Sequence, residues 1–147
     1  MNLKNILFFS EETDFKPKGK TILRKWIVKT ITAEKFTSLG ALNLILCNDD
    51  YLLDINQSYL NHDTLTDIIT FDNSEGVPDK ISGDIFISID RVIENAAKYN
   101  VPFETELHRV IIHGVLHLCG YMDKSTQEKS VMRNKEDHYL SLLTTLQ

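Results

Sequence analysis

The sequence has 147 residues, a length that fits one domain with a single buried core. A composition of 42% hydrophobic and 25% charged residues argues against a disordered chain, and no apolar run of about 18 residues indicates a membrane span. The net charge of −5 excludes a protein whose whole surface binds nucleic acid, but it allows a local basic groove.

The apolar pattern predicts four strands and about five helices, with no repeat or long linker, so we expect one domain over residues 1–147. In chain order we expect a strand at 5–10, a helix at 20–36, a strand at 41–47, a helix at 48–60, strands at 66–72 and 83–88, and helices at about 88–99, 103–119 and 125–143. This order predicts an α+β fold, a single mixed sheet with helices packed on it. The runs 41–47 and 83–88 are almost continuously apolar, which favours inner strands.

Two features indicate the cellular compartment. Cys47 and Cys119 each lie singly among apolar neighbours, so we expect buried thiols in a reducing environment and no disulfide. The N-terminal segment is too short and becomes acidic too soon for a secretory signal. We therefore expect a cytoplasmic protein with no membrane association.

The stretch HGVLHLCGYMD, residues 113–123, contains the candidate ligands of a metal site. His113 and His117 lie one helical turn apart, so both imidazoles can reach one divalent cation. Gly120 can adopt a positive φ and end the helix, which would bring Asp123 to the same point. Three protein ligands leave a fourth position for water, as in catalytic zinc sites. A histidine pair at this spacing alone is more often a surface pair, and Gly120 and Asp123 shift the balance towards a metal.

The same stretch resembles the HGxLHLxGYDH signature of the YbeY family. INQSYLNHDTLTDIITF, residues 55–71, resembles the family block LNxxYRxxDxxTDVLSF, SGDIFIS resembles its GDIxIS strand, and Glu106 occupies the place of a family glutamate. The resemblance implies a single-strand-specific, metal-dependent endoribonuclease of bacterial 16S rRNA 3′-end maturation and ribosome quality control. It also implies one Zn²⁺ per chain, and ribosomal RNA with ribosomal subunits or a ribosome-associated protein as partners.

Two residues depart from the family pattern. Asp123 stands where the third histidine ligand is usual, and a carboxylate can take that position on zinc. Leu60 stands where an arginine is usual, a residue well suited to bind a phosphate. Lys124 or Arg133 are candidates to replace it. The departure at Leu60 bears on RNA cleavage more than on the metal site.

The open ligand position suggests a mechanism in which the metal polarises a phosphoryl oxygen and lowers the pKa of a bound water towards ~7, so that water is the nucleophile. His113, Asp67 and His62 are the candidate catalytic residues. Asp67 and His62 lie in the matched block and are candidate proton-transfer groups. Asp67 suits a backbone cap at the strand entrance as well as it suits proton transfer. For His62, a solvated side chain in a polar turn is the more common case. Glu106 could contact a ligand or a basic residue that faces RNA, but an exposed helix position is the more common case.

Two other functions are compatible with the motif. The spacing HxxxHxxGxxD resembles the zincin-like metal helix of metzincin peptidases, but Gly114 occupies the place of their glutamate base. The loss of the usual arginine at position 60 suggests a non-catalytic ribosome-assembly factor with a bound metal. The pattern does not predict the oligomeric state.

Overall fold

Four strands form one mixed sheet in the computed structural model, which describes residues 1–147. The strands are β1 (Ile6–Glu11), β2 (Ser38–Cys47), β3 (Ile68–Asp72) and β4 (Lys80–Ser88), in the order β1-β2-β4-β3. β1 pairs with β2 and β2 with β4 in parallel, whereas β3 runs antiparallel to β4. The two apolar runs are therefore the inner strands β2 and β4, and the prediction is confirmed.

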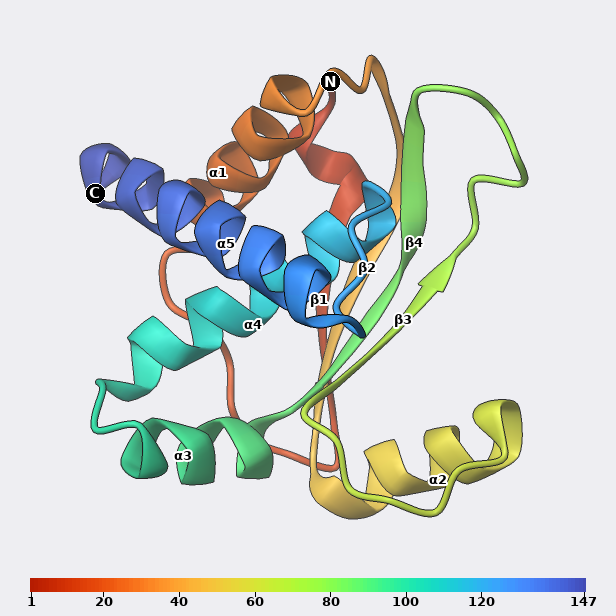
Figure 1. Cartoon of the computed structure of the whole chain (residues 1–147), viewed down its shortest axis with the longest axis vertical. Coiled ribbons are helices and arrows are strands. Elements are labelled where there is room, and N and C mark those ends of the chain that lie inside the picture. Colours follow the sequence, from red (N-terminus) through yellow and green to blue (C-terminus); the bar gives the residue numbers. More distant parts are fainter.

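Five α-helices accompany the sheet, which confirms the α+β prediction. They are α1 (Lys20–Ala33), α2 (Asp49–Leu60), α3 (Ile89–Lys98), α4 (Phe103–Leu118) and α5 (Thr126–Leu146), after a short 3-10 turn η1 (Leu3–Asn5). Helices α1, α4 and α5 lie on one side of the sheet and α2 on the other (Figure 1). None of these helices has the length and apolar character needed to cross a membrane.

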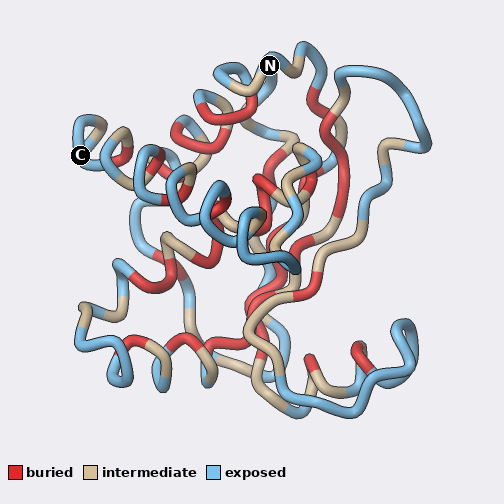
Figure 2. The backbone as a smooth tube through the Cα atoms, viewed as in Figure 1, coloured by how far each residue is buried: buried red, intermediate tan, exposed pale blue.

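Helix α4 is the central helix of the molecule. Leu107, Ile111 and Leu118, which recur at helical spacing along one side of it, are buried. Ile112 and Val115, on another side of the helix, are also fully buried, and α4 contacts α5 and α1 as well as the sheet. Figure 2 shows buried backbone concentrated in the central strands and on the inner sides of the helices. The histidine motif therefore stands on a helix that packs against α1, α3, α5, β3 and β4.

Candidate metal centre

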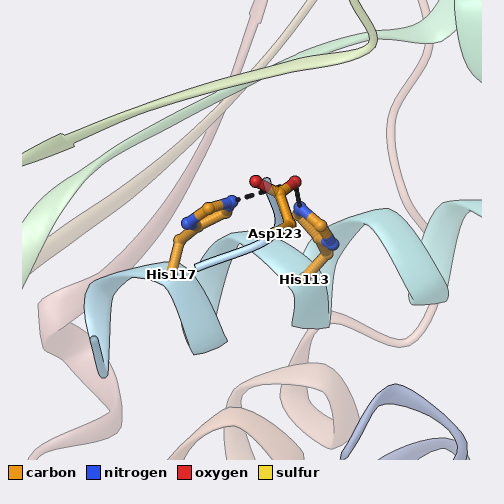
Figure 3. A group of neighbouring side chains, drawn as sticks. All are labelled: His113, His117 and Asp123. Atoms are coloured by element: carbon orange, nitrogen blue, oxygen red, sulfur yellow. Dashed lines mark ion pairs between the residues drawn. The ribbon is translucent and has the colours of Figure 1, made fainter. Parts of the chain in front are cut away.

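His113 and His117 project side by side from α4, and Asp123 reaches back to them from the segment after the helix (Figure 3). The Asp123 Oδ2 atom lies 3.2 Å from Nε2 of His113 and 3.4 Å from Nε2 of His117. One ligand atom from each residue falls within a group no more than 4.8 Å across. The structure thus brings together the three residues that the sequence suggested as metal ligands.

The turn after α4 places Asp123 by a defined backbone motif. Gly120 has a φ of +105°, and its N–H donates to the carbonyl of His117, while the N–H of Tyr121 donates to the carbonyl of Leu116. These two hydrogen bonds form a Schellman motif, which reverses the chain at the end of a helix. A capping box between Ser125 and Glu128 then starts α5. Asp123 is held between two fixed helix ends.

A hydrogen bond anchors the same turn to α1. The hydroxyl of Tyr121 donates to Oε1 of Glu34 at 2.6 Å, and Oε2 of Glu34 accepts from Lys135 at 3.0 Å and from Tyr139. Burial would raise the pKa of Glu34, but the hydrogen bonds from Tyr121, Tyr139 and Lys135 outweigh burial and lower it. An ionised Glu34 therefore ties the turn to α5.

The two distances from Asp123 to the imidazoles are compatible with a metal ion such as zinc. Zinc bonds to nitrogen and oxygen are about 2.0–2.2 Å long, so two ligand atoms on a tetrahedral zinc lie about 3.3–3.5 Å apart. The distances of 3.2 and 3.4 Å from Asp123 to the two imidazoles are close to this edge length. The donor set, two imidazole nitrogens and one carboxylate oxygen, is one that zinc accepts with a fourth position left for water.

Glu136 of α5 completes the surroundings of His113. Its Oε2 atom lies 2.7 Å from Nδ1 of His113, and its Oε1 atom lies 2.9 Å from Nη1 of Arg109. Burial would raise the pKa of Glu136, but the hydrogen bonds from His113 and Arg109 outweigh it and hold the pKa below its usual value. Glu136 and Arg109 could not be predicted from the sequence, because the contact between His113 and Glu136 joins residues 23 positions apart on two helices.

The three candidate ligands lie in the wall of a groove of about 680 Å³. This groove also contains the other candidate residues named from the sequence: Leu60, His62, Asp67, Glu106, Lys124 and Arg133. Its charged side chains are three cations and four carboxylates, so one divalent ion would change the net formal charge of the groove from negative to positive. A metal there would favour the binding of an anion.

The remaining candidates differ in their surroundings. Burial raises the pKa of the Asp67 carboxyl, and the nearby His113 offsets only part of this effect. Glu106 is only 6% exposed, so the expectation of an exposed helix position was wrong, and burial together with Asp67 raises its pKa as well. The side chain of His62 is exposed at the groove and makes no hydrogen bond or ion pair within the chain. Asp67 and Glu106 are thus carboxyl groups of the groove whose pKa is raised, whereas the pKa of Glu136 is lowered.

Comparison with known proteins agrees with the motif. The model of the family described as Endoribonuclease YbeY matches residues 6–144. A Flavobacterium psychrophilum protein named Endoribonuclease YbeY is 54% identical over 93% of this chain and 96% of its own length. A Cytophaga hutchinsonii protein of the same name is 51% identical over 97% of this chain and 98% of its own.

The fold of this chain is similar to that of a Thermotoga maritima protein solved in solution. The two share 29% sequence identity, and their TM-score is 0.64. The match covers 94% of this chain and 88% of the Thermotoga chain. The family match, the two relatives and the His113, His117 and Asp123 motif agree, and this chain belongs to the endoribonuclease YbeY family.

Proposed function

We propose that this protein is a single-strand-specific endoribonuclease, active as one domain, with His113, His117 and Asp123 as the ligands of one zinc ion per chain. The observation that carries the proposal is the convergence of three ligand atoms within 4.8 Å in the wall of a groove. Relatives that match over more than nine tenths of this chain are named endoribonucleases. The groove volume of about 680 Å³ is in the range of sites that enclose a small ligand, so it suits a short segment of an RNA strand.

When bound, zinc supplies a Lewis acid for a phosphoryl oxygen and lowers the pKa of a water towards about 7. The protein contributes the orientation of the two imidazoles on one rigid helix and a groove that excludes part of the solvent. Asp67, whose pKa is raised by burial, is suited to accept a proton from the attacking water and to return it to the leaving oxygen. His62, exposed at the groove, is the second candidate for proton transfer.

Arg133 is the best placed cation to bind the phosphate that the usual arginine at position 60 would bind. Arg109 is held by two carboxylates at 2.8 and 2.9 Å. The Arg133 side chain is 56% exposed and has only a 3.5 Å contact with Glu136, so its guanidinium can turn into the groove. Lys124 lines the same groove with no ion pair to another side chain. Arg133 and Lys124 thus replace in part the phosphate contact that an arginine at position 60 would make.

The proposed substrate is ribosomal RNA, at the 3′ end of 16S rRNA, in the cytoplasm. An acidic chain gains little from non-specific release of counterions, so its affinity for free RNA should be low and strongly salt-dependent. Recognition should therefore depend on the ribosomal subunit or on a ribosome-associated protein. Cleavage of 16S rRNA at the 3′ end would serve the proposed roles in 3′-end maturation and ribosome quality control.

A labelled fragment that spans the 16S 3′ end tests this function. Wild type should cut the single-stranded fragment, more rapidly with ribosomal subunits, and the His113→Ala protein should not. If wild type cuts neither substrate above the His113→Ala background, the protein is better described as a non-catalytic assembly factor with a bound metal. Digestion of casein under the same conditions would instead favour a peptidase, although Gly114 leaves that reaction without the usual glutamate base.

A further inference from the structure

Glu136 has a buried carboxylate with an unusual set of partners. Its side chain is only 7% exposed, and it contacts the Nδ1 atom of His113, the guanidinium of Arg109 at 2.9 Å and that of Arg133 at 3.5 Å. A buried charge is costly unless such partners compensate it. A role as a surface charge therefore does not explain why the Glu136 carboxylate is buried.

Pairing with Arg109 is not a sufficient reason. Asp137, the next residue on α5, binds the same guanidinium at 2.8 Å while its side chain stays 57% exposed. A carboxylate on this helix can thus hold Arg109 without being buried. Glu136, unlike Asp137, also lies 3.5 Å from the exposed Arg133 and 2.7 Å from Nδ1 of His113, and only the second contact reaches a candidate metal ligand.

The direction of this hydrogen bond fixes the ring of His113. An ionised carboxylate can only accept, so Nδ1 of His113 carries the hydrogen and donates it to Oε2 of Glu136. In the neutral imidazole the lone pair is then on Nε2, the atom that lies 3.2 Å from Oδ2 of Asp123. Two lone-pair atoms at that distance repel each other unless a proton or a metal ion lies between them.

We infer that Glu136 is the positioning residue of the metal centre: it holds His113 in the Nδ1–H tautomer, so that the Nε2 lone pair points at the ion shared with His117 and Asp123. The inference rests on the metal site proposed above. A carboxylate that accepts from a ligand imidazole also makes that imidazole a stronger donor, and the loss of such a partner costs about 10- to 100-fold in metal affinity. Glu136 acts through His113 and need not touch the substrate.

The test compares zinc affinity in wild type, Glu136→Gln and Asp137→Asn proteins, by competition with a chromophoric chelator and without RNA. Each variant removes one carboxylate from Arg109, but only Glu136→Gln replaces the anionic acceptor that faces His113 with a neutral amide. The zinc dissociation constant should rise about 10- to 100-fold in Glu136→Gln and less than about threefold in Asp137→Asn. Equal changes in the two variants would overturn the inference, while the zinc site of wild type would stand.

A second measurement does not depend on the folding of a variant. In the zinc-loaded wild type, nitrogen-15 NMR should show a slowly exchanging proton on Nδ1 of His113 and none on its Nε2. A His113 ring without a proton on Nδ1 would contradict the inference. If wild type binds no zinc, the metal site and the role of Glu136 fall together.

Discussion

Gly114 packs directly against Ile85 of the inner strand β4. A Cβ atom built on Gly114 would lie 2.8 Å from Cγ2 of Ile85, closer than a methyl group can approach. Gly114 follows the first histidine of the motif, so the absence of a side chain allows α4 to lie close to the sheet. Gly114, which stands where a metzincin peptidase has its glutamate base, thus allows close packing of α4 against β4.

We expect Gly114→Ala to destabilise the protein by about 1–2 kcal/mol. Overpacking costs about 1–3 kcal/mol, and the better helix propensity of alanine returns up to about 1 kcal/mol. Chemical denaturation measures the free energy of unfolding. Thr105→Ala, at an exposed position of α4, is the matched control and should be neutral or slightly stabilising. A Gly114→Ala protein as stable as this control would show that the helix can move away from β4 without cost.

Alanine at each of the three candidate ligands should lower the zinc content. Wild type purified without chelator or affinity tag should contain about one equivalent of zinc, because three ligands complete a catalytic site with water. His113→Ala, His117→Ala and Asp123→Ala should each lose most of it in elemental analysis. His138→Ala, a histidine of α5 outside the groove, should retain the wild-type amount. Full zinc in all three ligand variants would remove the proposed site.

Arginine at position 60 should increase the cleavage of free single-stranded RNA by up to ~10²-fold, since a charge-assisted contact contributes about 1.5–3 kcal/mol. Leu60 is 42% exposed and lines the groove of the metal ligands, so a longer cationic side chain can reach a bound phosphate. Initial rates on a labelled oligonucleotide measure the effect. Arg133→Gln should lower the rate in wild type and matter less in the Leu60→Arg background. Equal losses in both backgrounds would mean that the two positions do not serve the same phosphate.

The ionised Glu34 that anchors Tyr121 should make stability depend on pH. Its pKa in the folded protein lies below the ordinary value of 4.5, so the unfolded chain binds more protons in that window. The stabilisation that ionised Glu34 provides is therefore fully present above the pKa of this group in the unfolded chain. It is lost as the pH falls through the lower pKa in the folded protein. Glu34→Gln should cost about 1.5–3 kcal/mol near pH 7, as expected for hydrogen bonds to a charged group.

The difference between the unfolding free energies of wild type and Glu34→Gln should shrink from pH 6 to pH 3 in parallel denaturation curves. The comparison removes the contribution of the other carboxylates, which the two proteins share. Glu75→Gln, at an exposed turn, controls for the loss of one surface charge and should leave the pH profile unchanged. A wild-type advantage that stays constant over this range would mean that Glu34 is not held ionised by its partners.

Local sequence was sufficient to predict the inner strands and the proximity of His113, His117 and Asp123. Helical spacing alone pairs His113 with His117, and a glycine that permits a positive φ predicts the turn that returns Asp123. Strand ends were less accurate: β4 begins at Lys80, before its apolar run, because Lys80 pairs with Ser38 of β2. Pairing partners distant in sequence decide where a strand ends, and local periodicity does not predict those partners.

The contacts around the ligands could not be predicted for the same reason. Glu136 reaches His113 only because α5 packs on α4, and nothing near residue 136 marks it as different from Asp137. Glu106 was expected at the surface, since a glutamate on a helix is usually solvated. Its burial depends on the packing of the elements around the groove. The candidate ligands follow from a local pattern, whereas the residues that contact them follow from tertiary packing.

The most direct measurement is RNA cleavage during stepwise return of zinc to the metal-free protein. The chelated protein should be inactive on a single-stranded oligonucleotide, and activity should rise linearly with zinc and level off at about one equivalent per chain, as one three-ligand site requires. The His113→Ala protein, treated in the same way, should stay at background at every zinc level. Cleavage by the chelated protein at the wild-type rate, or a zinc response in His113→Ala equal to that of wild type, would contradict a metal-dependent ribonuclease built on His113, His117 and Asp123.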